Sequence, residues 1–213
     1  MPFRPRLTVF GLMALIALTG CTTIGVAPPP EPPSAADYAA VKDGDYELPA
    51  VPIKKVDKRY WRQTVAYKTS EKPGTIVVDT PNRFLYYVEP GGQAVRYGIS
   101  VGKSGFAWEG DAYIAWKQKW PKWTPPKEMV ERSPHLSKYA EDGMKPGLKN
   151  PLGARALYLF SPNGRDTLYR LHGTPEWRSI GKAASSGCIR LMNQDIIDLY
   201  NRVAVGRQAK VVV

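Results

Sequence analysis

Hydrophobic and β-branched positions recur with the spacing of strands from Thr75 onward, and they predict a domain that is mainly β. A turn signal at Pro81-Asn82 separates the first two strands, and Gly91-Gly92 reverses the chain into a hairpin. The predicted strands cover residues 75–79, 83–89, 93–101, 156–160, 167–172 and 210–213.

One amphipathic helix is predicted near the end of the chain. Asn193 is its expected cap, Asp195 places a negative charge in the first turn, and Gly206 lies beyond its end. The apolar face of this helix consists of Ile196, Ile197, Tyr200 and Val203. We expect that face to pack on the sheet.

Residues 106–155 are rich in loop signals and form too long an excursion for a simple connection. A short helix is predicted after Pro125-Pro126. The segment carries four tryptophans, which are Trp108, Trp116, Trp120 and Trp123. Long ordered loops often carry function, so this insert is a candidate part of a binding site.

The first 20 residues predict an export signal. Arg4 and Arg6 precede an apolar run over residues 7–18, which is too short to span a bilayer. The run ends in Leu-Thr-Gly-Cys, which resembles a bacterial lipobox and implies cleavage before Cys21 and lipidation of that cysteine. Thr22 in place of aspartate favours the outer membrane, by the same resemblance. The alternative is an ordinary cleaved signal that happens to end near a cysteine.

We therefore expect a periplasmic protein that is lipid-anchored to an envelope membrane. Residues 21–70 are predicted to contain the lipidated cysteine and a proline-rich spacer, because five prolines lie between residues 28 and 33 and two more at 49 and 52. Residues 71–213 are predicted to form the folded domain.

Charge and composition exclude several classes of function. The chain carries 30 Lys and Arg against 19 Asp and Glu, and it keeps 28 basic residues once residues 1–20 are removed. An exported basic protein meets anionic envelope polymers and lipids rather than nucleic acid. Two cysteines and two histidines, far apart in sequence, make a metal site improbable. No cofactor is expected.

Two short motif matches are rejected because required residues or spacings are missing. Gly98 and Gly102-Lys103-Ser104 have one residue too few between the glycines for a phosphate loop, so no nucleotide partner is predicted. Ser100 and Ser179 each begin a Ser-x-x-Lys match to serine acyl enzymes, but the companion elements are missing.

The chemistry is carried by Leu171-His172-Gly173-Thr174 and by the run from Ser185 to Leu191. Cys188 is the only thiol left once Cys21 is lipidated, so it is buried, modified or reactive. His172 could act as its base, the amides of Gly187 and Cys188 could stabilise an oxyanion, and Arg190 suits a carboxylate. Taken singly, each residue also has an ordinary structural interpretation.

Taken together, His-Gly-Thr followed by Ser-x-Gly-Cys-Ile-Arg-Leu resembles the signature of the L,D-transpeptidases of the YkuD type. The resemblance implies a β-sandwich-like catalytic fold and no requirement for ATP. It implies that Cys188 attacks a tetrapeptide stem of peptidoglycan, releases the terminal D-Ala and forms a thioester, which a neighbouring stem amine resolves into a 3→3 cross-link.

By this resemblance His172 is the general base, Arg190 holds a substrate carboxylate, and Gly173 and Ser186 contribute to substrate binding. Many relatives carry histidine where this chain has Ser186, so either Ser186 or a carbonyl near Gly173 orients His172. The tryptophan-rich insert is either a lid over the donor stem or a satellite core.

Two other functions stay open at this point. The same acyl enzyme could pass its acyl group to an outer-membrane protein, to a D-amino acid or to water. Alternatively, the protein is a non-catalytic lipoprotein that binds the wall.

Overall fold

The computed structural model describes Met1, residues 32–103 and residues 109–213, without the side chains of residues 207–209. The predicted signal over residues 2–20, the predicted lipidation site Cys21 and Trp108 lie outside the described residues. No helix within the described ranges has the length and apolar character needed to cross a bilayer.

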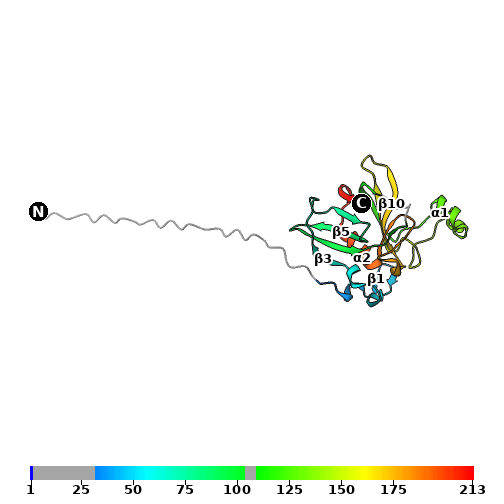
Figure 1. Cartoon of the computed structure of the whole chain (residues 1–213), viewed down its shortest axis with the longest axis horizontal. Helices are drawn as coiled ribbons and strands as arrows, with labels where there is room; N and C mark the ends of the chain where they lie inside the picture. Colours follow the sequence, from blue (N-terminus) through cyan, green and yellow to red (C-terminus); the bar gives the residue numbers. More distant parts are fainter. Residues whose placement is uncertain (2–31, 104–108) are drawn as a thin grey trace.

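The described chain is mainly β, as predicted, and is built on one mixed sheet of nine strands (Figure 1). The strand order is β12-β10-β9-β8-β13-β4-β5-β6-β3, and neighbours are antiparallel except β10 with β12 and β4 with β13. The bounds are β3 Gln63–Ala66, β4 Ile76–Asp79, β5 Phe84–Glu89, β6 Gln93–Gly98, β8 Asp111–Lys119, β9 Arg155–Phe160, β10 Asp166–Thr174, β12 Ile189–Met192 and β13 Gly206–Val212.

The sheet curls, so that β12 at one end of the order lies against β6 near the other end. Ser100, just beyond β6, exchanges both backbone hydrogen bonds with Arg190 at 2.9 Å. A small parallel pair, β7 (Val101–Gly102) with β11 (Ala183–Ser185), continues this contact. The two halves enclose one apolar core that includes Ile76, Leu85, Tyr97, Leu157, Leu171 and Leu191.

The six predicted strands are present. Three further strands of the main sheet, β3, β8 and β12, were not predicted, and β8 lies within the region predicted to be an insert. Its hydrophobic alternation is broken because a register shift separates Ile114 from Trp116 in the pairing with β9. A bulge of this kind hides a strand from any search for period two. Residues after β8 do form the predicted short helix, α1 (Lys127–Arg132), which is followed by the 3-10 helix η4 (Pro134–Tyr139).

The predicted C-terminal helix is α2 (Asn193–Arg202), and it packs on β9 and β10 as expected (Figure 1). Ile196 and Leu199 are fully buried against the core. The predicted cap is wrong, because Met192 occupies the cap position and Asn193 is the first helical residue. The Asn193 side chain is used elsewhere, since its Oδ1 accepts a 2.9 Å hydrogen bond from the amide of Ala154.

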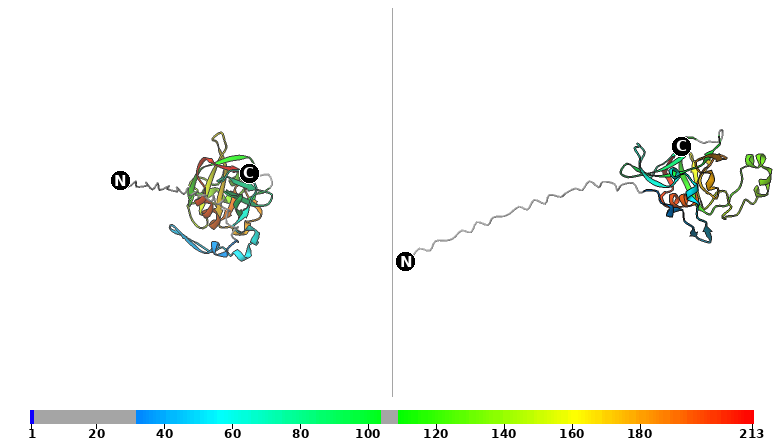
Figure 2. Two further views of the ribbon diagram at one scale, coloured as in Figure 1. Left: turned by 90° about the vertical axis from the view of Figure 1, so that its left-hand side faces the viewer. Right: turned by 60° about the horizontal axis from the view of Figure 1, so that its bottom comes forward.

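The prediction of an extended spacer through residue 70 is wrong for residues 35–66, which we call the N-terminal segment. Its elements are η1 (Ala35–Tyr38), β1 (Val41–Asp43), β2 (Tyr46–Leu48), η2 (Ile53–Lys55), η3 (Lys58–Tyr60) and strand β3 of the main sheet. Figure 2 shows this part of the chain, in blue and cyan, lying against the domain.

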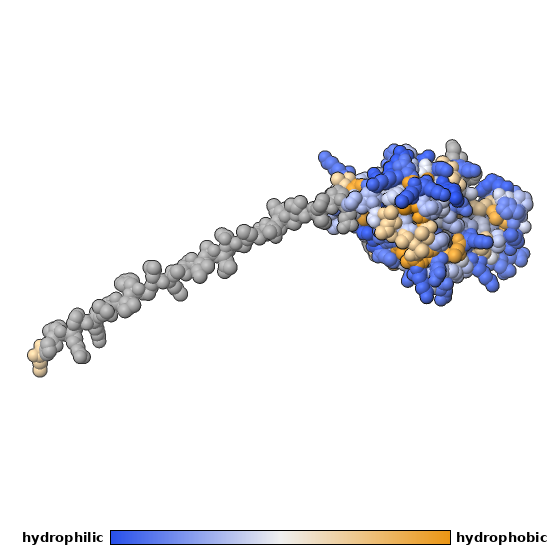
Figure 3. All heavy atoms as spheres, turned by 90° about the horizontal axis from the view of Figure 1, so that it is seen from below, coloured by the Kyte–Doolittle hydropathy of each residue, from blue (hydrophilic) through white to orange (hydrophobic). Residues whose placement is uncertain are grey.

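Side chains of the N-terminal segment form a second core with Ile180 and Met192 from the C-terminal part of the chain. We call this core the aromatic cluster, and its buried members are Tyr38, Ile53, Val56, Tyr60, Trp61, Ile180 and Met192. The prolines of the segment are compatible with this packing because its elements are short and are joined by extended turns. Seen from below, the surface is mostly hydrophilic around a limited hydrophobic patch (Figure 3).

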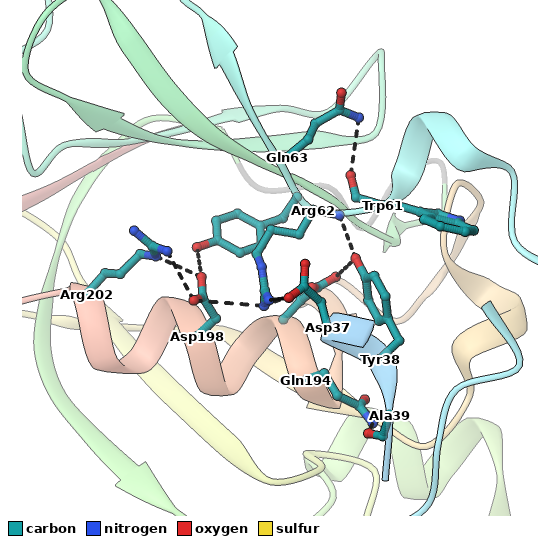
Figure 4. Close-up of polar contacts among 11 residues, drawn as sticks. Asp37, Tyr38, Ala39, Trp61, Arg62, Gln63, Gln194, Asp198 and Arg202 are labelled. Carbon is teal, nitrogen blue, oxygen red and sulfur yellow. Dashed lines mark hydrogen bonds and ion pairs between the residues drawn. The ribbon is translucent and has the colours of Figure 1, made fainter. Parts of the chain in front are cut away.

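An ion-pair network ties the N-terminal segment to α2 (Figure 4). Arg62 lies 3.1 Å from Asp37, 3.6 Å from Asp195 and 3.9 Å from Asp198. Tyr38 donates its hydroxyl proton to Asp195 over 3.3 Å. Asp195 is fully buried, and burial raises the pKa of its carboxyl to about 7 although Arg62 opposes the shift.

A separate contact attaches the β1–β2 hairpin to the insert. Asp43 receives two hydrogen bonds from the buried guanidinium of Arg155, at 2.6 and 2.7 Å, and a third from the indole Nε1 of Trp120 at 2.8 Å. The ring of Tyr46 lies 4.0 Å from that of Trp120. At Trp120, the insert therefore packs into a local core, which is the second of the two interpretations offered for its tryptophans.

Candidate active site

Parallel pairing of β10 with β12 brings the predicted catalytic residues together. Leu171 pairs with Ile189 and His172 pairs with Arg190. Side chains alternate along a strand, so Leu171, Ile189 and Leu191 enter the core while His172 and Arg190 share the opposite face. Cys188 precedes β12 and falls on that same face by alternation, which we call the site face.

Strand spacing fixes how far apart these groups are. His172 and Cys188 are diagonal neighbours on adjacent strands, so their Cα atoms are about 8 Å apart. That separation is within reach of an imidazole and a thiol that turn toward each other. Cys188 lies in the bend just before β12, so the pairing of β10 with β12 and the turn over residues 186–188 together determine the position of its thiol.

The thiol of Cys188 is half-buried and lies at the edge of β10. Its Sγ is 4.0 Å from the carbonyl oxygen of Leu168, and the amide of Arg170 is beside it. Burial raises the pKa of the thiol, although the Arg170 amide and the charges of Arg170 and Arg190 favour the thiolate. The pKa shift therefore favours the neutral thiol, which would need a base to become a nucleophile.

His172 is buried, with 4% of its surface exposed, and its orientation is fixed. Its Nδ1 lies 2.6 Å from the carbonyl oxygen of Gly173, so Nδ1 carries the proton that donates there. Nε2 is consequently the basic nitrogen. Burial lowers the pKa of His172 to about 4, with smaller contributions from Arg190 and Arg170.

The Gly173 carbonyl is thus the group that orients His172, one of the two options left open by the sequence. Gly173 itself is buried rather than presented to a substrate, which corrects its predicted contact. A Cβ at this position would lie 2.3 Å from Asn193 Oδ1 and 2.9 Å from Ile196, so only glycine lets α2 approach β10 this closely.

The hydroxyl of Ser185, a residue of the predicted motif to which no role was assigned, organises the turn before Cys188. The buried Ser185 donates to the carbonyl oxygen of Cys188 over 2.6 Å and accepts from the amide of Gly187 over 3.1 Å. Gly187 has φ of 131°, which favours glycine. The Gly187 amide, one of the two predicted oxyanion donors, is therefore engaged by Ser185 in this structure. Ser186 is exposed in this turn.

Arg190 is held by its backbone and leaves its side chain half-buried on the site face. Among the described residues, no carboxylate lies within 4.0 Å of its guanidinium. Burial lowers the pKa of this guanidinium, with Cys188 and Glu176 acting in the opposite direction. An arginine held in this way is suited to a carboxylate brought by a ligand.

The comparisons with known proteins agree with this geometry. The family model described as the L,D-transpeptidase catalytic domain, YkuD, matches residues 73–213. The chain belongs to the L,D-transpeptidase family.

Two relatives illustrate the extent of this family likeness. A Fuscovulum blasticum protein named as an L,D-transpeptidase in the ATP synthase subunits region is 34% identical over 139 residues, covering 64% of this chain and 68% of its own. The probable L,D-transpeptidase ErfK/SrfK of Escherichia coli is 33% identical over 144 residues, and the chain spans only 43% of its length.

A solved structure supports the fold of this L,D-transpeptidase domain. It is a Brucella melitensis protein described as a probable carnitine operon oxidoreductase, with 48% sequence identity and a TM-score of 0.51. The match covers 73% of this chain and 95% of that one.

Sequence reasoning missed a row of planar side chains that begins beside Cys188 in this L,D-transpeptidase domain. Arg170 on β10 is paired with Tyr158 on β9, and Tyr158 is paired with Trp116 on β8. The guanidinium of Arg170 lies 4.4 Å from the Tyr158 ring centre, and the Tyr158 and Trp116 rings stack at 3.5 Å. Only the register reveals the row, because the three residues come from three separate strands.

Proposed function

We propose that this protein is a cysteine L,D-transpeptidase that forms 3→3 cross-links in peptidoglycan. The observation that carries the proposal is the parallel register of β10 and β12, which supports a nucleophile at Cys188, a base at His172 and a carboxylate anchor at Arg190 on one face. Membership of the family supports the class of reaction.

In the first half-reaction, the sulfur of Cys188 attacks the carbonyl carbon that precedes the terminal D-Ala of a tetrapeptide stem. Nε2 of His172 takes the thiol proton and returns it to the leaving nitrogen. The carbon–nitrogen bond breaks, the carbon–sulfur bond remains, and free D-Ala leaves. The energy of the peptide bond is kept in the thioester, so no nucleotide is consumed.

The amide of Cys188 stabilises the oxygen that becomes negative during attack, while the bonded Gly187 amide holds the turn in shape. Arg190 pairs with a carboxylate of the donor stem. This pairing also neutralises one of the charges that depress the pKa of His172, so substrate binding makes the imidazole a better base. Catalytic hydrogen bonds are commonly longer in unliganded enzymes and shorten in the complex.

We further propose that Cys21 carries a lipid anchor and that the protein acts in the periplasm, anchored to the outer membrane. The export signal and the residue after Cys21 support this location. Metabolic labelling with a palmitate analogue tests it, because label should enter the wild-type protein and not Cys21→Ala. Fractionation of labelled cells then assigns the membrane.

Intact mass tests the catalytic proposal. Full-length protein incubated with a tetrapeptide muropeptide should gain the mass of the peptide minus D-Ala, and Cys188→Ala should gain nothing. No gain in the wild-type protein would favour a non-catalytic wall-binding role. Product analysis assigns the acceptor, since cross-linked stems, a modified outer-membrane protein, an exchanged D-amino acid and a hydrolysed tripeptide differ in mass.

A further inference from the structure

A groove opens between the N-terminal segment and the chain that connects His172 to Cys188. Val56 and Tyr60 contribute to it from the N-terminal segment, and Trp177 and Ile180 contribute from the connecting chain. Its volume is about 430 Å³, which is within the usual range for small-ligand sites. Four of its nine lining residues thus lie outside the 73–213 range that the family model matches.

Three cationic side chains surround this apolar floor. Lys55, Arg178 and Lys182 line the groove and are exposed, whereas Asp57 is its single acid. Asp57 is already engaged, because it accepts from the amide of Arg59 and lies 3.7 Å from the guanidinium of Arg59. The rim therefore has unbalanced positive charge that suits carboxylates on a ligand. We call this site the basic groove.

The basic groove lies on the same side of the sheet as the nucleophile. Cys188, Arg190 and Met192 alternate along the strand, so all three belong to the site face. Met192 is fully buried in the aromatic cluster beside Val56, Tyr60 and Ile180, three of the residues that line the groove. The rise along β12 puts Cys188 about 13 Å from Met192, a distance that four or five extended peptide residues span.

The wall of the groove is rigidly connected to the catalytic strands. The amide of Gly181 donates to the carbonyl of Ile99, and the hydroxyl of Ser100 donates to the carbonyl of Lys182. Ser100 is in turn paired with Arg190. The Tyr60 ring presses on the opposite wall, because a Cβ at Gly181 would lie 2.5 Å from it. A ligand in the groove would therefore be held in a fixed position relative to Cys188.

We propose that the basic groove binds the carboxylates of the acceptor stem peptide, and so selects an anionic peptide over a neutral amine in the second half-reaction. This inference rests on the proposed function. In that step the acceptor amine attacks the thioester carbon, the new carbon–nitrogen bond forms and the carbon–sulfur bond breaks. His172 takes the proton from the amine and returns it to sulfur, which regenerates the thiol.

The positive charge on the rim of the groove and its position along the site face from Cys188 favour an acceptor peptide over a membrane surface. A peptide seated here can extend to Cys188 along the site face, whereas a lipid headgroup would gain nothing from that alignment. Exposed ion pairs are individually weak, so two lysine contacts together are expected to give a preference of about tenfold.

The test separates the two half-reactions in the full-length protein. Acyl enzyme is first formed with a tetrapeptide donor, and its transfer is then timed with two acceptors, a tetrapeptide and the same peptide with its carboxylates amidated. The double variant Lys55→Gln with Lys182→Gln should form acyl enzyme normally, transfer about tenfold more slowly to the free peptide, and lose the preference for it. Lys149→Gln, an exposed lysine in the insert, is the matched control.

Each outcome decides something different. Normal acylation with an unchanged acceptor preference in the double variant overturns the groove proposal and leaves the proposed function intact. Failure of the wild-type protein to form a thioester overturns both. Loss of binding to anionic lipid vesicles with unchanged transfer would show that the groove recognises a membrane and would likewise overturn this proposal.

Discussion

The catalytic strands and the N-terminal segment meet at Met192 but are held in place by different forces. β10 and β12 place His172 and Arg190 through backbone pairing, and Gly173 admits the helix behind them. The part of the N-terminal segment before β3 is attached mainly through side chains, by the aromatic cluster, by Arg62 and by the Asp43–Arg155 pair, whereas β3 itself pairs with β6. The positions of β10 and β12 therefore depend little on the charge of nearby side chains. The attachment of the N-terminal segment depends on buried ion pairs.

This difference matters for how each region responds to change. Buried ion pairs are costly to break because the remaining partner is left without compensation in a poor solvent for charge. Backbone pairing is instead sensitive to volume, since an extra atom at a close contact forces strands and helices apart. Four experiments separate these cases.

The largest effect is expected at the catalytic base. His172→Ala should slow acylation of Cys188 by about 10²- to 10⁴-fold, because the neutral thiol loses its proton acceptor. Since the pKa of His172 is lowered to about 4, the wild-type rate should hold between pH 7 and pH 5.5. A tenfold fall over that range would mean that the imidazole titrates near its ordinary pKa, and would contradict the buried, neutral histidine described above.

The next effect tests the attachment of the β1–β2 hairpin. Asp43→Asn should lower the free energy of unfolding by about 3 kcal/mol, because it leaves the buried guanidinium of Arg155 without its anion. Glu71→Gln removes the partner of Lys210 in a more exposed pair and should lower the free energy of unfolding much less, because solvent screens that pair. Urea unfolding measures the free energy of unfolding of both variants. Equal losses would show that burial does not make the Asp43–Arg155 pair more important than the Glu71–Lys210 pair.

A smaller effect is expected where the helix meets the catalytic strand. Gly173→Ala should lower the free energy of unfolding by about 1–3 kcal/mol and also reduce activity, because the displaced carbonyl no longer orients His172. Gly164→Ala, in the turn after β9, has open space around it and a φ of 85°. Gly164→Ala should lower the free energy of unfolding by about 1 kcal/mol without loss of activity. Full activity in Gly173→Ala would contradict the positioning role.

The smallest expected effect is a pH dependence of the free energy of unfolding, caused by Asp195 in the ion-pair network of Arg62. The pKa of Asp195 is raised to about 7, above its unfolded value near 4, so this group favours folding below pH 4 and loses that contribution as pH rises to 7. The stability of Asp195→Asn relative to wild type should therefore increase by about 1–2 kcal/mol between pH 5 and pH 8. A difference that does not change with pH would show that Asp195 is ionised throughout.

Much of the fold and of the catalytic constellation follows from sequence alone. Strands with regular alternation were predicted because each has one face in the core, whereas β8 was missed because its bulge disrupts that alternation. The N-terminal segment was predicted to be extended because a proline-rich run at residues 28–33 precedes it and two further prolines, Pro49 and Pro52, lie within it. Its stability comes from Arg62 and a few aromatic rings that meet distant partners, and no local pattern reports such contacts.

Within the site, Cys188, His172 and Arg190 were visible as unusual residues in a specific arrangement. Ser185 belongs to the same motif, but its structural role becomes apparent only from its two hydrogen bonds in the turn. The row from Arg170 to Trp116 depends on the register of β8, β9 and β10, and register requires the complete sheet.

The most direct test of the account is to locate the acyl group on the protein. Trypsin should release residues 183–190, a peptide that contains Ser185, Ser186 and Cys188. After incubation with a tetrapeptide muropeptide, tandem mass spectrometry should find the peptide minus D-Ala on the sulfur of Cys188, in a bond that hydroxylamine cleaves. An acyl group on either serine, or one that persists in Cys188→Ala, would contradict the assignment of the nucleophile.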